Sequence, residues 1–509
     1  MMAYGVIMLI KHWRKLLAAS LIAGTLTFAP EIYGVQNFPV VHAEVKLYTA
    51  MGVDYGNEYE SQEIVKLRAR DKAIKNATKQ AGVYLKTYSR SINNELTDDE
   101  VLAITSNAYE VVGEVRYNQN VKQVTDDITL IVWEATVDVN VDDSEITKWN
   151  KREDRERSTL ISQTRESQTL SEENDRKVED LRRRSQKVSD DAGRAQLKTQ
   201  FEQADNEFLS NQKVEEGTRL AYQQKFDEAI KLYTEAIELK SDNAAAYNWR
   251  GNIRNAVAMN KIYAEKNVSV GEKFRKEAID DLNRAIQLKP DYSEAYGNRG
   301  FVYYMAKDYP AAIADYNRAI ELDPTNAQNY IYRSTYWTQI TKDNNRALTD
   351  LNKAIELKPS AHTYRNRAGF YRTQKNFLSA IEDLTRAIEL DTQDNSLALS
   401  YHGRGNCYKE LKMYDKAIAD YTRTIELNQE DSIALGYFGR AEVYQAMKNF
   451  GAAIDDYTKL IELPATTTSK ILLPVTYYLR AQCYKALGDN AKAQADMKKY
   501  DEFKVAGGR

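Results

Sequence analysis

The chain has 509 residues, which is too long for one hydrophobic core, so we expect two to four folding units. A charged fraction of 28% and an apolar fraction of 43% are typical of soluble helical domains rather than of a membrane protein. The formal net charge of -3 provides no basic excess, so nucleic acid is not expected as a partner. Two cysteines are too few for a fold held together by disulfides.

Residues 1–43 have the features of a secretory signal peptide. A positive segment with Lys11, Arg14 and Lys15 precedes an apolar run over residues 16–28, and Val41-His-Ala43 is a small-residue cleavage site. We therefore expect cleavage after Ala43 and a mature chain that is periplasmic, extracellular or attached to the cell envelope. The alternative is an uncleaved membrane anchor, although the apolar run is shorter than a full span. This segment provides the only membrane contact that we expect.

Residues 44–145 predict a small α+β module. The segment Val45–Val53 has a strand pattern, and a long helix follows over residues 59–85. This helix carries a stripe of alanines, spaced by four, that would let a sheet approach closely: Ala69, Ala73, Ala77 and Ala81. A second helix over residues 98–107 begins at Thr97-Asp-Asp-Glu100, a capping-box pattern. Further strands are predicted over residues 110–118 and 128–141.

The same module resembles the N-terminal domain of flagellar assembly protein T and related small envelope lipoproteins. The resemblance covers about 100 residues. It implies a periplasmic or surface assembly module without enzymatic activity. The residues that carry it are Gly52, Ala69-Arg-Asp-Lys-Ala73-Ile-Lys-Asn-Ala77, Gly82-Val-Tyr84, Tyr109-Glu-Val-Val112 and the later Val-Asp-Val.

Residues 146–209 predict a charged helical spacer. Charged residues dominate it, but Leu197, Phe201, Ala204 and Phe208 form a short heptad-like apolar stripe. We expect a solvated helix whose last turns dock on the structure that follows. The alternative is that the stripe is a coiled-coil-like seam through which the chain forms a homodimer.

A repeated motif organises residues 210–509. Its clearest copy is Tyr296-Gly-Asn-Arg299-Gly300-Phe-Val-Tyr303, followed by Ala312, Tyr316 and Ala319, and it recurs about eight times. This spacing resembles the helix–turn–helix signature of the tetratricopeptide repeat. The resemblance implies an α–α superhelical solenoid whose concave groove binds a protein or peptide partner. One repeat carries an insertion near residues 260–273, which we interpret as a surface segment and a candidate specificity element.

An arginine and an aspartate recur together in this array. The first repeat lacks both, since Glu216 and Leu232 stand at the two positions. This joint absence predicts an Arg–Asp pair inside each of the other repeats, because partly buried charges need partners. The alternative is a basic ladder that binds an acidic ligand. The predicted pairs are Arg250–Asp281, Arg299–Asp315, Arg333–Asp350, Arg367–Asp383, Arg404–Asp420, Arg440–Asp456 and Arg480–Asp496.

The resemblance also implies which side chains face a partner, since the family uses defined positions of the first helix in each repeat. Their mixture of aromatic, amide and cationic groups would suit an extended peptide. The Lys and Asn set with which chaperone-binding members hold a carboxylate is present only in part, at Asn366 and Asn406. The candidate groove residues are Trp249, Phe301, Tyr304, Tyr332, Arg365, Asn366, Arg372, His402, Asn406, Lys409 and Phe438.

The sequence contains none of the motifs that usually accompany catalysis. A phosphate-binding glycine loop, a nucleophile elbow and metal-spaced Cys or His clusters are all absent from it. We therefore expect a mostly α protein without catalytic residues, cofactor or metal, which acts as a secreted scaffold in envelope assembly. The alternatives are a self-associating structural component of the envelope and a glycan-binding protein.

Overall fold

A computed structural model describes residues 45–506 except 92–95, 126–127, 143, 151–153, 189, 266, 391–396, 428–431 and 465–466. The predicted signal peptide, residues 1–43, lies outside the described residues. The chain divides into two compact units, and each is described here by itself. The first contains residues 1–149 and 156–290, and the second contains residues 150–155 and 291–509. In the described part of the chain, no helix has the length and apolarity needed to cross a membrane.

The first unit begins with an antiparallel sheet in which one long strand is central. This strand pairs with β1 along one edge and with β2 and β3 along the other edge. The strand predicted over residues 110–118 is wrong as a single element. Gly113 has a φ of +71°, so the chain turns there and divides the run into two strands. The strands are β1 (Val45–Gly56), β2 (Glu110–Val111), β3 (Arg116–Thr125) and β4 (Ile128–Asp142).

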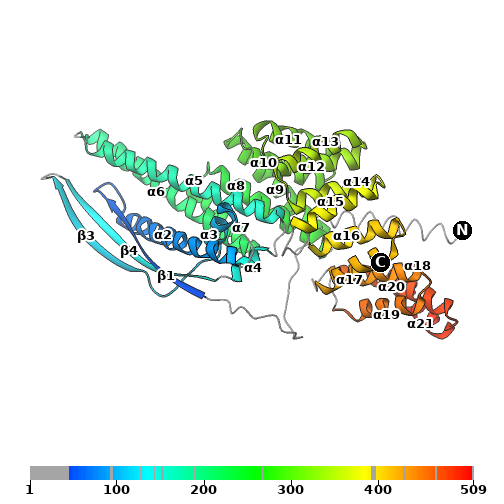
Figure 1. Cartoon of the computed structure of the whole chain (residues 1–509). Coiled ribbons are helices and arrows are strands. Elements are labelled where there is room, and N and C mark those ends of the chain that lie inside the picture. Colours follow the sequence, from blue (N-terminus) through cyan, green and yellow to red (C-terminus); the bar gives the residue numbers. More distant parts are fainter. Residues whose placement is uncertain are drawn as a thin grey trace. The chain divides into compact units, whose positions relative to one another are not determined.

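The helix α2 (Gln62–Ser91) covers one face of this sheet (Figure 1). Its four predicted alanines are fully buried, and Ala135, Val137 and Val139 of β4 lie in the same core. The approach is closest at Gly52 of β1. A Cβ atom there would lie 2.2 Å from the backbone nitrogen of Ala73. The small side chains therefore let a helix and a strand pack almost backbone to backbone.

The helix α3 (Asp98–Asn107) forms with the predicted capping box. The hydroxyl of Thr97 accepts a hydrogen bond from the amide of Glu100, and the carboxylate of Glu100 accepts one from the amide of Thr97. These two bonds satisfy amides that a helix start otherwise leaves unpaired. A short helix, α4 (Ser144–Asn150), follows the sheet and buries Trp149 in the same core.

The predicted spacer is two long helices, α5 (Asp154–Ser185) and α6 (Asp191–Tyr222). Leu197, Phe201 and Ala204 of α6 are buried against Val178 and Leu181 of α5. The prediction of a solvated spacer is therefore wrong, and the apolar stripe packs inside the chain. The boundary predicted at residues 209–210 is also wrong, because α6 continues through it as one helix.

A buried ionic network holds α5 and α6 on the N-terminal module. Arg182 of α5 donates to Glu60 at 2.7 and 2.9 Å and to Asp54 at 3.2 Å. Arg68 of α2 donates to Glu60 at 3.1 Å and to Asp205 of α6 at 2.8 Å. Burial alone would raise the pKa of Asp54, but Arg182 and Lys72 lower it overall. Asp54 therefore stays ionised beside buried cations, as a buried charge requires.

The remaining helices form antiparallel pairs. Two pairs lie in the first unit, α6 with α7 (Phe226–Leu239) and α8 (Ala244–Met259) with α9 (Val268–Leu288). In the second unit, the first helices α10, α12, α14, α16, α18 and α20 each pack on the helix that follows. Their bounds are α10 (Ser293–Met305), α11 (Tyr309–Leu322), α12 (Ala327–Tyr336), α13 (Asn344–Leu357), α14 (Ala361–Thr373), α15 (Phe377–Leu390), α16 (Leu397–Glu410), α17 (Tyr414–Glu426), α18 (Ser432–Ala446), α19 (Phe450–Glu462), α20 (Thr467–Ala486) and α21 (Asn490–Ala506).

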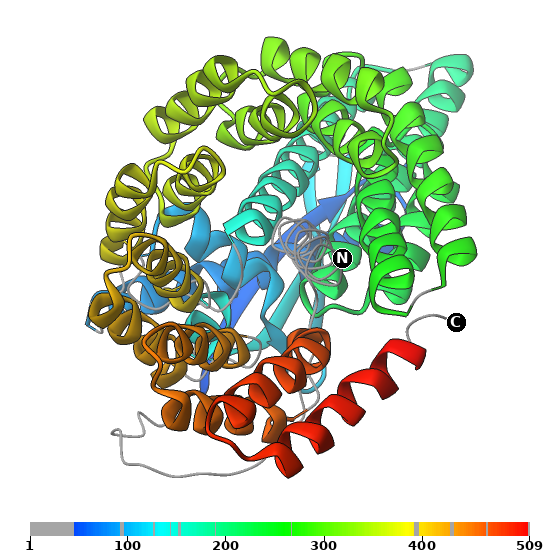
Figure 2. The same ribbon diagram turned by 90° about the vertical axis from the view of Figure 1, so that its right-hand side faces the viewer.

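The helices of the second unit follow one another around an arc, coloured from green through yellow to red in Figure 2. The first helices also contact each other from repeat to repeat, as α16 does with α18 and α18 with α20. They form a continuous row, and their outward side chains share one face of the array. The described part of this unit therefore has the architecture of a helical solenoid.

The insertion near residues 260–273 is exposed at residues 267–270, 272 and 273, as expected of a surface segment, and it is mostly helical. It extends both helices of its repeat, α8 through a π-helical turn, η1 (Asn260–Ala264), and α9 at its N-terminus. The two extensions pack tightly, because a Cβ at Gly271 would lie 2.3 Å from the side chain of Ile262.

The close contact at Gly52 predicts that even a small side chain at this position destabilises the packing of α2 on β1. We expect Gly52→Ala to lower the local stability of the sheet by about 2 kcal/mol, since the added methyl group must push α2 away from β1. Amide hydrogen exchange of β1 and α2, measured by mass spectrometry on the full chain, should become correspondingly faster. Gly369→Ala in α14 is the control, because a Cβ there meets no atom within 4 Å. Unchanged protection in the Gly52 variant would contradict the close-packing argument.

Candidate functional site

Each predicted arginine of the repeats lies against the aspartate of its own repeat. In the pair Arg367–Asp383, for example, Nε and Nη2 of the arginine donate to the two carboxylate oxygens at 2.8 and 2.7 Å. The two side chains are 22% and 6% exposed. The same two-bond geometry occurs in six further repeats, at Arg250, Arg299, Arg333, Arg404, Arg440 and Arg480. These arginines are therefore bound within the fold, which argues against a basic ladder.

The remaining nitrogen of the guanidinium, Nη1, donates a hydrogen bond to the preceding repeat in most of these arginines. Nη1 of Arg367 donates to Asn352 at 2.8 Å, and Nη1 of Arg440 donates to Thr422 at 2.8 Å. Equivalent bonds join Arg250 to Thr234, Arg333 to Asn317, Arg404 to Thr385 and Arg480 to Thr458. One arginine thus joins the two helices of its repeat and the second helix of the repeat before it.

This arrangement predicts that the pair stabilises the array. We expect Arg367→Met to lower the free energy of unfolding of the second unit by about 1–3 kcal/mol, since Asp383 is left charged and nearly buried. The double variant Arg367→Met, Asp383→Leu should recover much of this loss, because no unpaired charge remains. Thermal denaturation followed by circular dichroism measures both changes.

The exposed pair Arg386–Glu389 on α15 supplies the control. Arg386→Met should leave the melting temperature unchanged, because exposed ion pairs contribute little. A melting temperature of Arg367→Met equal to that of the wild type would show that the buried pair is not stabilising.

Trp249, a predicted groove residue, is wrong as a ligand contact. Its side chain is 2% exposed, and its indole N–H donates to the carboxylate of Glu166 at 2.7 Å. Glu166 belongs to α5, and Leu170 of the same helix packs against the cluster that contains Trp249. The tryptophan therefore joins the second repeat to α5, an arrangement that the repeat motif alone does not indicate.

The predicted aromatic anchors of the second unit mostly pack between repeats. Phe301 is 4% exposed and stacks on Tyr332 at 5.3 Å between ring centroids, so it is also wrong as an exposed contact. Tyr332 stacks in turn on Tyr316 at 5.5 Å. The hydroxyl of half-buried Tyr304 donates to Gln339 at 2.9 Å. Half-buried Phe438 packs against core clusters of its repeat.

The predicted polar residues come together around α16. The ring nitrogen Nε2 of His402 lies 2.8 Å from the amide nitrogen of Asn406. The hydroxyl of Tyr421 on α17 donates to the amide oxygen of Asn406 at 2.8 Å. Lys409, one turn further along α16, donates to Glu442 of α18 at 2.5 Å. The sequence had not indicated Tyr421 or Glu442, although Tyr421 occupies the tyrosine position of the second helix.

These bonds define the protonation state of His402. Because the amide oxygen of Asn406 accepts from Tyr421, its nitrogen donates to Nε2, and the ring proton sits on Nδ1. Burial, followed by the charges of Arg372 and Lys409, lowers the pKa of His402 to about 3. The ring is therefore neutral at physiological pH, and Nδ1 has no hydrogen-bond partner among the described residues.

Arg372 of α14 lies beside this cluster. Its Nη1 is 3.8 Å from the position that a Cβ on Gly403 would take, so the guanidinium lies close to α16. It is half-buried, and its charge lowers the pKa of His402, but its side chain makes no hydrogen bond or ion pair with any residue that the structure describes. Two further predicted residues lie on α14. The side-chain amide of Asn366 donates to the carbonyl oxygen of His362 at 2.8 Å, and Arg365 is half-buried, as Arg372 is.

The neutral histidine predicts a pH dependence of stability. The folded-state pKa lies below the unfolded value of about 6.5, so the contribution of His402 is complete above that pH and is lost as the pH falls toward 3. At pH 5 the loss amounts to about 2 kcal/mol. We expect His402→Gln to lose less stability than the wild type between pH 7 and pH 5, measured by urea denaturation. Parallel curves for the two proteins would contradict this assignment.

Comparisons with known proteins match the repeat region. Models described as tetratricopeptide repeats match residues 217–254, 276–307, 293–326, 359–430, 434–467 and 475–504. The Hsp70-Hsp90 organizing protein of Triticum aestivum is 30% identical over 105 residues, which are 21% of this chain and 16% of that protein. The chain thus spans about a sixth of the length of this relative.

Two solved structures match part of the chain at low identity. A tetratricopeptide repeat protein from Parabacteroides merdae matches 52% of this chain and 98% of its own, with 18% identity and a TM-score of 0.38. PilW, a type IV pilus biogenesis factor, matches 41% of this chain and 91% of its own, with 20% identity and a TM-score of 0.36.

Repeated helix pairs, stacked first helices and a side-chain row along those helices define a solenoid protein of the protein-interaction class. The chain carries tetratricopeptide repeats in the segments that these models match. In the part of the chain that the structure describes, no group of three or more His, Cys, Asp or Glu residues is arranged to hold a metal ion.

Proposed function

We propose that the chain is a non-enzymatic scaffold of the cell envelope that holds an acidic, extended segment of a protein partner along α14, α16 and α18. The observation that carries this proposal is the guanidinium of Arg372. It is half-buried, and no residue in the described structure hydrogen-bonds or ion-pairs with it. A cation in such a position gains stability when a carboxylate binds, and a bidentate pair with arginine also orients that carboxylate.

The surroundings of Arg372 support an anionic rather than a cationic partner. His402 is neutral and adds no opposing charge, while Lys409 lies on the next first helix and shares its ammonium with Glu442. The aromatic rings of this face are largely used in packing, so polar contacts rather than aromatic anchors would select the partner. An extended peptide reaches several first helices at once, as the row of helices requires.

The location of the protein is part of the same proposal. The signal-peptide features of residues 1–43 would bring the chain to the periplasm or the cell surface, where the partner would be found. The mass of the chain recovered from an envelope fraction tests this location. A mature chain that begins at Glu44 supports it, and an intact N-terminus in the cytosol would contradict it.

An affinity capture tests the binding site. The full mature chain is used as bait for an envelope extract, beside the variants Arg372→Glu and Arg386→Glu. We expect a protein that the wild type and Arg386→Glu retain equally, and that Arg372→Glu retains at least tenfold less, because the new carboxylate repels the acidic segment. A synthetic peptide from the captured protein should bind with the same order of affinities.

The control variant changes the same residue type on a second helix, where Arg386 pairs only with exposed Glu389. Circular dichroism must show that all three baits are folded. Equal capture by all three would reject the Arg372 site. A capture that depends instead on protein concentration, with the chain retaining itself, would favour the alternative of a self-associating envelope component.

A further inference from the structure

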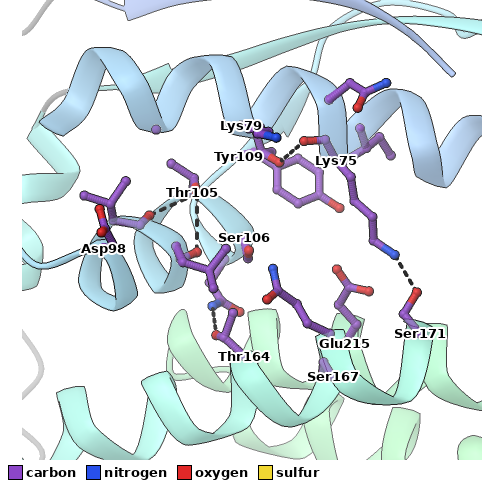
Figure 3. A pocket seen from close by; sticks show the side chains of 18 of the residues that line it. Lys75, Lys79, Asp98, Thr105, Ser106, Tyr109, Thr164, Ser167, Ser171 and Glu215 are labelled. Carbon is purple, nitrogen blue, oxygen red and sulfur yellow. Dashed lines mark hydrogen bonds between the residues drawn. The ribbon is translucent and has the colours of Figure 1, made fainter. Parts of the chain in front are cut away.

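The first unit contains a pocket that is separate from the groove of the second unit. Helices α2, α3, α5 and α6 enclose about 610 Å³, a volume typical of sites for small ligands. Figure 3 shows that Lys75 and Glu215 extend into it from opposite walls. Every residue of its lining belongs to the first unit, so the argument that follows does not rest on the proposed groove.

Glu215 of α6 is the most unusual group in this pocket. Its carboxyl group makes no hydrogen bond or ion pair with a residue that the structure describes. Burial, and then the nearby charge of Asp71, raise the pKa of Glu215 to about 7, although Lys75 and Arg219 oppose the shift. Glu215 is half-buried, and a bound ammonium or N–H donor would stabilise its carboxylate through a charge-assisted hydrogen bond.

Two hydroxyl groups near Glu215 provide further hydrogen-bonding capacity in the pocket. The hydroxyl oxygen of Ser167 on α5 is buried and has no hydrogen-bond partner among the described residues. Burial, followed by the charge of Glu215, raises the pKa of Tyr109 to about 12, so its phenol remains a proton donor. A ligand group that both donates and accepts hydrogen bonds therefore fits the deep end of the pocket.

The opposite wall carries three lysines on α2. Lys75 donates to Ser171 at 2.6 Å and pairs with Asp71 at 2.6 Å, and Lys86 pairs with Asp98. Lys79 is exposed and has no described partner. Its ammonium group is thus available for a carboxylate at the mouth, and the wall as a whole disfavours a ligand with several positive charges.

The apolar part of the lining narrows the ligand class further. Ile74, Val101 and Leu102 line the pocket beside the polar groups, which suits a short aliphatic side chain. Tyr109 contributes the one aromatic ring in the lining, whereas carbohydrate sites usually stack sugars on several aromatic faces. A ligand with one ammonium group, a small apolar part and a carboxylate matches all three regions.

We propose that this pocket binds a short peptide of two or three residues through its free α-ammonium group, which pairs with the carboxylate of Glu215. The peptide carboxylate faces Lys79 at the mouth, and a side chain lies against Val101 and Leu102. Bound in this way, the peptide supplies a donor to Glu215 and fills a pocket formed jointly by the N-terminal module and the helices that follow it.

Equilibrium dialysis with mass spectrometry tests this proposal. The full mature chain is dialysed against an equimolar mixture of tripeptides with free amino and carboxyl groups, and in parallel against the same mixture after N-acetylation. We expect the free tripeptides to be retained at least tenfold more strongly than the acetylated ones. Glu215→Gln should abolish this difference, because its side chain keeps its shape but loses its charge.

Two further variants make the test specific. Glu216→Gln, at an exposed position outside the pocket, should retain peptides as the wild type does. Lys79→Gln, an exposed change that does not threaten folding, should remove the preference for free carboxylates over C-terminal amides. Equal retention of free and acetylated tripeptides by the wild type, or retention that Glu215→Gln leaves unchanged, would overturn the proposal.

Discussion

The arginine–aspartate pair that seven repeats share is the interaction on which the array depends. A single guanidinium satisfies both oxygens of a nearly buried aspartate on its own second helix and, in six repeats, a polar side chain of the preceding one. Because the guanidinium is planar and its donors have fixed directions, these bonds set the angle between three helices at once. The small residues and tyrosines of the motif then fill the space that this geometry leaves, as Tyr421 does between Gly405 and Gly439.

In the first unit, other interactions hold the helices and the sheet together. Its first repeat lacks the arginine, and the long helices α5 and α6 lie against the N-terminal module instead. Glycine and alanine bring α2 onto the sheet, and the network of Arg182, Arg68 and Glu60 closes the remaining side. The charged composition of this segment, which suggests a solvated helix, is therefore explained in part by buried pairing. Removing one partner from such a network is far more costly than removing the whole network.

The two candidate sites lie in different units of the chain and use different ionisable groups. In the second unit, the guanidinium of Arg372 has no partner among the described residues and lies beside a neutral histidine, and the proposed ligand is a carboxylate. In the first unit, the carboxyl group of Glu215 has no hydrogen-bond or ion-pair partner in the described part of the chain and faces a wall with lysines, and the proposed ligand is an ammonium group. Both proposals start from the same observation, a half-buried ionisable group without a hydrogen-bond or ion-pair partner among the described residues. The two proposed sites use different residues, so each proposal is tested independently of the other.

The sequence by itself determined the repeat architecture, the α+β module and its capping box, and the arginine–aspartate pairs, since each follows from local spacing or from a joint absence in one repeat. The signal peptide and the resemblance to flagellar assembly protein T stay predictions. Only the tertiary structure decided that α6 is both spacer and first repeat, that Trp249 and Phe301 are buried, and that Glu215 and Arg372 have no hydrogen-bond or ion-pair partner among the described residues. Burial and pairing depend on which distant helices meet, and local periodicity carries no information about such contacts.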